Sequence, residues 1–336
     1  MADAAPVLSG VKASNAGGGG SCAVGAAWRV ARAFASDALR FWRHSFRREV
    51  RVREQLRARI AMDVSFLEYG MTLRFAERGH GFARADRLVA DLAAYLGRHG
   101  ADAQTAIAVR ALEAWTAYNA GLPKADAIAA RLAPLAAETP LRAGAQTVTR
   151  AEIQAASGID FARFAAARHS IRQYDPGRPD ARAVRRAVAL AQQSPSSCNR
   201  QTVRVHVWTE PALVARVVAL QSGNRGFGEQ LGGIAVVWTD LCNWTGAGER
   251  YSGYVDGGMF AMSLVYGLHA QGLGAVTLNW GEEPARDRAL RALTGLPDSA
   301  QVVVMVGFGL LPESLPVCVS QRRPIDACLT LDAPLR

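Results

Sequence analysis

Two arginines and a serine alternate in the segment Arg168-His169-Ser170-Ile171-Arg172. In an extended chain, residues 168, 170 and 172 face the same side. Two guanidinium groups flanking a hydroxyl would suit a phosphate monoester, because arginine presents paired donors to phosphate oxygens. The alternative is an exposed arginine pair without a ligand, and this segment alone does not decide between the two.

A second polar segment, residues 193–201, reads QSPSSCNRQ and lies between a predicted helix and a predicted strand. Its short side chains both donate and accept hydrogen bonds, so they could contact the polar edge of a cofactor. The alternative is a generic turn, since Ser, Pro and Asn are turn-forming residues.

A third segment begins with Asp256-Gly257-Gly258, continues as a helical pattern to Gln271, and leads into a strand that ends near Gly281. Glycines at the helix start permit close approach of another backbone, as in a buried helix that packs against a second subunit. An ordinary core helix is the alternative, and it is the preferred interpretation for His269 in this helix.

The elements that must position these segments differ between the two halves of the chain. Strand-like runs and helical patterns alternate in the second half, which predicts an α+β fold. The strands are expected at residues 203–209, 234–239, 275–280 and 302–308, and the helices from Asp180, from Pro211 and over residues 256–271. Residues 1–137 show no convincing strand, and helical patterns cover residues 28–60, 85–96 and 102–118 and begin again at Pro123.

These patterns predict four segments: a disordered tail over residues 1–20, a helical region over 21–137, a linker over 138–159, and a cofactor-binding domain over 160–336. An apolar stripe through Phe34, Ala38, Phe41 and Trp42 is expected to pack against a partner surface, with arginines on the other faces of its helix.

The formal net charge is +10, and much of the excess is local. Residues 28–60 hold ten Arg against Asp37, Glu49 and Glu54, a difference of 10 − 3 = +7. Such a stripe can bind nucleic acid or acidic lipid, but no nucleic-acid motif accompanies it, so we expect a solvated helix face and no nucleic-acid partner. The sequence contains no apolar run long enough for a membrane span. Its five widely spaced cysteines suit reduced thiols in a cytoplasmic protein and predict no metal site.

Together the motifs R-x-S-x-R, S-P-S-S-x-N-x-Q and a Gly-rich helix ending in G-L-G resemble the FMN-dependent nitroreductase family, in the same order and over about 170 residues. Residues 66–71 (FLEYGM) and 79–82 (GHGF) resemble a helical region that precedes this domain in some bacterial members. Tyr69 stands where those members usually have Lys, and Thr202-Val203 follow Gln201 where the family commonly has Pro-Trp.

The resemblance implies a nitroreductase-like mixed sheet flanked by helices, an all-α region before it, and a homodimer with two FMN sites at the subunit interface. Arg168, Ser170 and Arg172 would then hold the phosphate and ribityl group. Residues from the 195–201 loop would come from the partner subunit, Asn224 would lie near the pyrimidine edge, and Arg322 or Arg323 would add charge at the phosphate. Residues 278–281 would lie along the flavin face. The full expected cofactor-binding set is Arg168, His169, Ser170, Arg172, Pro195, Ser196, Ser197, Asn199, Gln201, Asn224, Leu278, Asn279, Trp280, Gly281, Arg322 and Arg323.

The leading interpretation is an FMN-dependent oxidoreductase in which hydride passes from NADH or NADPH, a transient donor, through flavin N5 to an unidentified small organic acceptor. No G-x-G-x-x-G motif follows a strand, which is consistent with a nicotinamide nucleotide that binds only transiently. Two alternatives stay open: a flavin-dependent substrate dehydrogenase or oxidase that does not use NAD(P)H, and a non-catalytic interaction protein with a degenerate flavin domain. No catalytic acid or base is identified.

Overall fold

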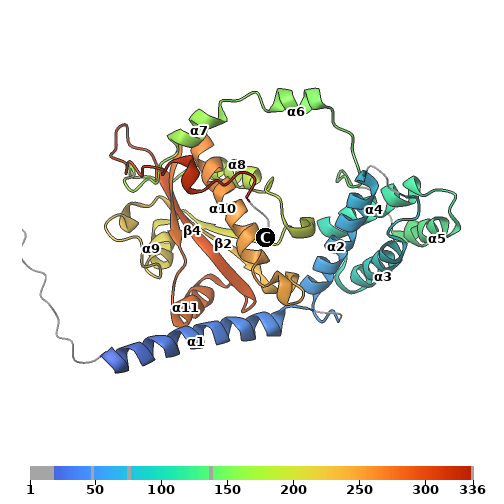
Figure 1. Cartoon of the computed structure of the whole chain (residues 1–336), viewed down its shortest axis with the longest axis horizontal. Helices are drawn as coiled ribbons and strands as arrows, with labels where there is room; N and C mark the ends of the chain where they lie inside the picture. Colours follow the sequence, from blue (N-terminus) through green and yellow to red (C-terminus); the bar gives the residue numbers. More distant parts are fainter. Residues whose placement is uncertain (1–18, 47–48, 74–76, 136–138, 334–336) are drawn as a thin grey trace, which may run out of the picture.

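The computed structural model describes residues 19–46, 49–73, 77–135 and 139–333 of the chain, and places an all-helical part before a part built around a sheet (Figure 1). The first part consists of α1 (Gly19–His44), α2 (Arg53–Thr72), α3 (Phe82–His99), α4 (Ala103–Tyr118) and α5 (Pro123–Leu132). The helices that follow are α6 (Arg150–Ala156), α7 (Phe161–Ala167), α8 (Ala181–Ala191), α9 (Pro211–Val218), α10 (Ser252–Ala270) and α11 (Pro284–Thr294). The strands are β1 (Val203–Trp208), β2 (Gly233–Asp240), β3 (Leu273–Asn279) and β4 (Ala300–Leu310).

The four strands form one sheet in the order β1-β2-β4-β3, and every neighbouring pair is antiparallel. Parallel pairing occurs among the described residues as isolated bridges, one of which joins Ser170 to Ala275 and extends the sheet beyond β3. The predicted α+β class, with an all-α region before it, is confirmed. All four predicted strands are present, each within three residues of its expected bounds.

Both faces of the sheet are buried, which explains why β2 is apolar along most of its length. Ile234 and Val236 face a core shared with α9 and α11, whereas Ala235 and Val237 face a core shared with α8 and α10. Because successive side chains of a strand point to opposite faces, a strand covered on both sides loses the alternation of apolar and polar residues. The helices on the two faces therefore make a three-layer arrangement (Figure 1).

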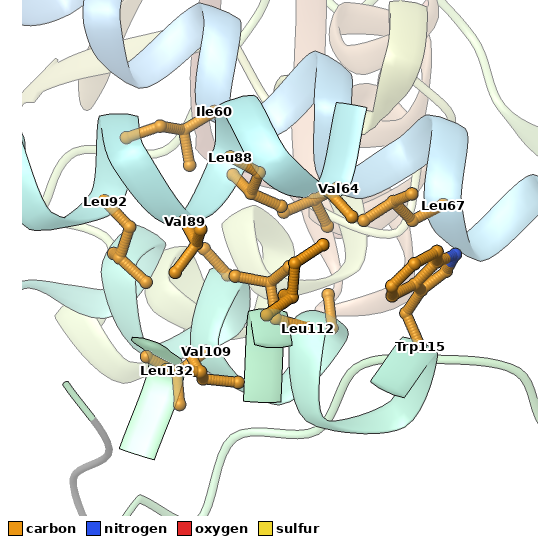
Figure 2. Close-up of a cluster of buried hydrophobic side chains, with 14 of the residues drawn as sticks. Ile60, Val64, Leu67, Leu88, Val89, Leu92, Val109, Leu112, Trp115 and Leu132 are labelled. Carbon is orange, nitrogen blue, oxygen red and sulfur yellow. The ribbon is translucent and has the colours of Figure 1, made fainter. Parts of the chain in front are cut away.

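Helices α2 to α5 bury a separate apolar core, shown in Figure 2. Leu67, Leu112 and Trp115 are each no more than 1% exposed, and the Trp115 indole donates a hydrogen bond to the His80 carbonyl at 2.9 Å. Asp102 caps α4 by accepting a hydrogen bond from the Thr105 amide, and Pro123 occupies the first turn of α5 as expected.

The helix expected over residues 28–60 is wrong as one element. Helix α1 ends at His44 and α2 begins at Arg53, with Phe46 held between them by a hydrogen bond from its amide to the Trp244 carbonyl. Helical periodicity continues on both sides of this break, so it did not reveal a contact made with a residue about 200 positions away in the sequence.

The expectation that the apolar stripe of this helix packs against a partner surface is not met among the residues that the structure describes. Phe34 and Trp42 are 68% and 67% exposed. The opposite edge of α1 faces the sheet, where the Arg40 guanidinium donates to the carbonyls of Asp298 and Ala300. Hydrogen bonds from Arg40 to these two backbone carbonyls therefore help to orient α1.

Two short helices, α6 and α7, lie in the connection between the two parts and were not predicted from the sequence. Residues 139–149 contain no helix or strand, and the capping box of Thr149 and Glu152 starts α6 within the expected 138–159 linker. Most of the expected N-terminal tail, residues 1–18, lies outside the described residues, and Gly19 and Gly20 already belong to α1.

A fully buried carboxylate joins α2 to α3. Asp63 is 0% exposed and accepts hydrogen bonds from Arg84 at 3.0 Å and from the Arg87 Nε at 2.8 Å. Burial of an ionised carboxylate is costly unless charged donors surround it, and here two guanidinium groups do so.

We expect Asp63→Asn to lower the free energy of unfolding by about 1.5 to 3 kcal/mol, the range for a lost hydrogen bond to a charged group, because both arginines keep partial access to water. Asp86→Asn is the matched control, since Asp86 makes an exposed pair with Arg131 worth at most about 1 kcal/mol. Chemical denaturation of both variants measures this difference. Equal losses in the two variants would show that Asp63 has no special structural role.

Candidate functional site

A small cavity lies at the β3 edge of the sheet, where the chain leaves α7. The backbone is extended here, and the Ile171 amide donates to the Ala275 carbonyl at 3.0 Å. Arg168, His169 and His269 line this cavity of about 260 Å³, which we call the edge cavity. Its remaining wall is largely apolar and comes from β3, α10 and the C-terminal segment, through Ile171, Val265, Leu273, Gly274, Ala275, Leu311, Leu315 and Val317.

His269 is a residue of the edge cavity that the sequence analysis assigned to an ordinary core. Its ring packs against Phe164 with 4.8 Å between centroids. Burial lowers the pKa of His269, and the nearby charges of Arg168 and His169 lower it further, against a raising contribution from the Phe164 backbone. The cavity therefore places the Arg168 guanidinium beside two imidazole rings and an apolar wall, and the arginine charge favours an anion there. The position of His269 in α10 gave no indication of this role in the sequence, because its proximity to residues 168 and 169 arises only in the tertiary structure.

The other arginines of the predicted phosphate clamp are more exposed. Arg172 lies near the C-terminal segment, with its guanidinium 3.6 Å from the Cys318 sulfur. Arg322 donates to the Ser320 carbonyl at 2.8 Å, and Arg323 is exposed on the same segment. Arg172 therefore neighbours this segment, while no described hydrogen bond or ion pair joins Arg322 or Arg323 to residues 168–172.

The polar loop of residues 195–201 is held at the other end of α10. Both the amide and the hydroxyl of Ser197 donate to the buried Asp256 carboxylate, at 3.0 and 2.9 Å. Cys198, Asn199 and Gln201 all have positive φ, between 46° and 52°, a region that non-glycine residues rarely occupy. Three such residues within four positions store backbone strain, which marks this loop as a functional candidate and gives Asp256 the role of holding it in place.

Arg200 also holds this loop in place through its buried side chain, and it was not among the residues expected from the sequence. Its side chain is 1% exposed and forms an ion pair with Glu249 and a hydrogen bond to the Asn243 carbonyl at 2.7 Å. Burial alone would raise the pKa of Glu249, but hydrogen bonds from Arg200 and from the Thr245 amide outweigh it and hold that pKa below its ordinary value.

A third group of expected residues meets at the end of β3. The Gln221 side chain donates to the Asn279 carbonyl at 3.0 Å, and Asn224 donates to the Gln221 side chain at 3.2 Å. Leu278 is buried, and the Trp280 indole donates to Asp287 of α11 at 3.0 Å. Asn224 and residues 278–281 are therefore brought together, with Gln221 as a link that the sequence analysis did not identify.

The expected cofactor residues form separate groups within one chain. Residues 168 and 169 lie beside His269 near the end of α10, whereas Ser197 is bound to Asp256 near its start. Thirteen residues of helix separate these two positions, which corresponds to about 20 Å at 1.5 Å per residue. The edge cavity contains no residue of the 195–201 loop, and the cavity beside Ser196 contains neither Arg168 nor His269.

The depressed pKa of Glu249 gives a pH-dependent prediction. A carboxylate whose pKa is lowered by folding adds stability above its unfolded pKa, and this stability is lost as the pH falls through the folded value. Glu249→Gln should therefore lower the free energy of unfolding by about 1.5 to 3 kcal/mol near neutral pH. The difference from the wild type should shrink below about pH 4.3, the ordinary glutamate pKa. Denaturation series across the acid range measure it, and a difference independent of pH would contradict the ion pair.

The described residues contain no cluster of three or more His, Cys, Asp or Glu side chains able to hold a metal ion. None of the helices in the described part of the chain combines the length and the apolar character that crossing a membrane requires.

Comparison with known proteins gives a family match in the first part of this site. Residues 165–224 match the model of the nitroreductase family. Similar solved structures include a nitroreductase family protein from Clostridium difficile, with 17% identity, coverage of 52% of this chain and 100% of its own, and a TM-score of 0.45. A nitroreductase family protein from Streptococcus pneumoniae has 19% identity, coverage of 51% of this chain and 99% of its own, and a TM-score of 0.43. An FMN-dependent nitroreductase from Clostridium difficile has 17% identity, coverage of 47% of this chain and 91% of its own, and a TM-score of 0.41.

No curated protein matches the chain in sequence. The matched segment, residues 165–224, contains the R-x-S-x-R motif and the strained loop of residues 195–201, and it ends at Asn224. This match confirms the resemblance that the ordered motifs indicate: residues 165–224 carry the nitroreductase family pattern.

Proposed function

We propose that the protein is an FMN-dependent oxidoreductase that uses NADH or NADPH as a transient electron donor and reduces a small organic acceptor. The observation that carries this proposal is the edge cavity, where Arg168 and His169 of the family-matched segment meet His269 of α10. When bound, FMN would supply the redox chemistry, accepting hydride at N5 and passing it on.

The edge cavity fits the phosphate end of FMN. Arg168 offers a guanidinium fork to phosphate oxygens, and His169 and His269 line the same cavity. Ser170 and Arg172 do not line the edge cavity itself; Ser170 lies next to it and pairs with β3 through its bridge to Ala275. The chain would thus bind and orient the phosphate from a fixed sheet edge rather than from a mobile loop.

The far end of β3 would then hold the ring. Asn224 and Gln221 present side-chain amides beside Asn279, so hydrogen-bond donors and acceptors are available for the polar edge of a flavin. The Asp287 contact fixes the Trp280 indole and with it the turn that follows β3. These side chains would orient the ring and exclude water from one of its faces.

The polar loop of residues 195–201 would serve the flavin of a second subunit. Within its own chain it is bound to Asp256, which lies about 20 Å along α10 from His269 of the edge cavity, and one face of that helix is apolar and exposed. Tyr251, Val255, Met259 and Met262 recur at intervals of three or four residues and are 57%, 58%, 37% and 40% exposed. An apolar helix stripe of this kind is typical of a subunit interface. We therefore propose a homodimer that buries α10.

The proposed function is tested by turnover of the FMN-loaded protein with NADH or NADPH and an artificial two-electron acceptor. Consumption of either nucleotide, absent when FMN is removed and restored when it is added back, is the expected result. A protein that binds FMN but consumes neither nucleotide would instead support a flavin enzyme that works without NAD(P)H. A protein that binds no FMN would overturn the proposal.

Arg168→Ala should weaken FMN binding by about 1.5 to 3 kcal/mol, because one hydrogen-bonded charge on the phosphate is lost. Arg182→Ala is the matched control, since Arg182 is 87% exposed at the start of α8 and does not line the edge cavity. Flavin fluorescence titrations of apoprotein give both affinities. Unchanged affinity in Arg168→Ala would remove this residue from the phosphate site.

Met259→Asp should disrupt the dimer and reduce flavin occupancy, because a charge would be buried in an apolar interface expected to exceed about 2,000 Å². Leu213→Asp places the same charge on an exposed apolar position of α9, which covers the other face of the sheet, and should leave the dimer intact. Light scattering with flavin absorbance reports both quantities. A wild-type monomer that is fully loaded with flavin would contradict the shared site.

A further inference from the structure

A second basic cavity lies where the helical part meets the sheet. Helix α2 packs against the turn of residues 197–199 and against the turn of residues 241–243. Two adjoining hollows, of about 180 and 480 Å³, lie along this contact. Both are lined by Arg57 of α2, Gln104 of α4, and Arg200 and Arg204 at the start of β1, and we call them together the arginine cavity.

Two of these arginines carry buried donors without a partner. The Nε atoms of Arg57 and Arg200 are buried and make no hydrogen bond. The Arg57 Nε lies 3.5 Å from the Asp102 carboxylate, within ion-pair range but outside hydrogen-bond geometry. A buried donor left unsatisfied is destabilising, so these two guanidinium groups do not have all their donors paired within the described chain.

Arg204 has no carboxylate partner among the described residues and donates to the backbone carbonyls of Gln201 and Val203. Desolvation lowers the pKa of Arg204, and so does the neighbouring Arg57 charge, with a smaller opposing contribution from Asp240. Arginines from two different parts of the chain therefore face each other across the cavity, and an anion between them would relieve their repulsion.

Most carboxylates near the cavity already have hydrogen-bond partners in the protein. Glu249 binds Arg200 and the Thr245 amide, Asp256 binds Ser197, and Asp240 accepts from the Cys242 amide. Glu54 lines only the larger hollow. The lining of the smaller hollow has three arginines, of which Arg200 pairs with Glu249 and Arg57 with Asp102. Arg204 therefore has no carboxylate partner among the described residues, and the carboxylate of the lining, Asp256, is already hydrogen-bonded to Ser197.

We propose that the arginine cavity binds the oxyanion of a small molecule, a phosphate or carboxylate group, with Arg57 and Arg204 as the main donors. The site would not exist without the helical part, which supplies Arg57 and Gln104. It is separate from the edge cavity, with which it shares no lining residue. Because Ser196 and Gln201 form one wall, the bound anion also contacts the strained loop and links its position to α2.

The test uses the full chain and isothermal titration at constant ionic strength, with inorganic phosphate and succinate as separate probes. Arg57→Gln and Arg204→Gln should each weaken binding of the preferred anion at least about tenfold, the loss expected for one charge-assisted hydrogen bond. Arg182→Gln should bind like the wild type. The stronger of the two probes identifies the ligand as a phosphate or a carboxylate.

Because phosphate is also expected in the edge cavity, Arg168→Gln separates the two sites: it should leave binding in the arginine cavity unchanged. Circular dichroism checks that each variant folds. If Arg57→Gln does not fold, the binding measured for Arg204→Gln, on the edge strand β1, decides the test. The proposal is overturned if the wild type binds neither anion, or if binding depends on Arg168 and not on Arg57 or Arg204. Because Ser196 and Gln201 also belong to the loop proposed to serve a partner's flavin, the titrations use flavin-free protein. Whether that protein can be loaded with FMN is measured separately, so a failure of this proposal and a failure of the proposed function are distinguishable.

Discussion

The close approach of α10 to the sheet and to α8 is the constraint on which the rest of the structure depends. An added Cβ at Gly257 would lie 2.5 Å from Val303, and one at Gly267 would lie 2.6 Å from the Ala187 carbonyl oxygen. These distances are shorter than side-chain contacts allow, so only glycine permits this packing. Because α10 holds Asp256 near one end and His269 near the other, its position determines where the strained loop and the edge cavity lie.

The helical part is joined to this framework mainly through arginine. Within it, Arg59 pairs with Asp91, and Arg84 and Arg87 pair with Asp63. Toward the sheet, Arg40 reaches the loop before β4, and Arg57 faces the arginine cavity. Part of the basic excess in residues 28–60 is thus used inside the molecule, a different outcome from the solvated helix face that the sequence favoured. The proposed anion site would give this part of the chain a direct role in ligand binding.

Local patterns were sufficient to predict the strands, most helices and the class of fold. Apolar runs located the strands, Asp180 and Pro211 located two helix starts, and the order of three motifs indicated the family. The break between α1 and α2 was not predictable, because it depends on the pairing of Phe46 with Thr245. The outward-facing stripe of α1 was missed for a similar reason, since Arg40 binds carbonyls that are distant in sequence.

The site was predictable where a motif is contiguous and unpredictable where distant segments meet. Residues 168–172 and 195–201 stood out by spacing and composition. His269 and Gln221 did not stand out, and Arg200 was not distinguished from its neighbours in the polar loop. Their importance comes from contacts with residues 168 and 169, Asn279 and Glu249 that only the folded chain creates. A buried ion pair such as that of Arg200 has no periodicity in the sequence.

The most direct measurement of the central claim is an anaerobic titration of the FMN-loaded protein with NADH and, separately, with NADPH. If the chain binds FMN and presents its reactive face to a nicotinamide nucleotide, the visible flavin absorbance should bleach in proportion to the amount of one of the two nucleotides added. Flavin that stays oxidised in excess of both nucleotides, or purified protein that cannot be loaded with FMN, would contradict it.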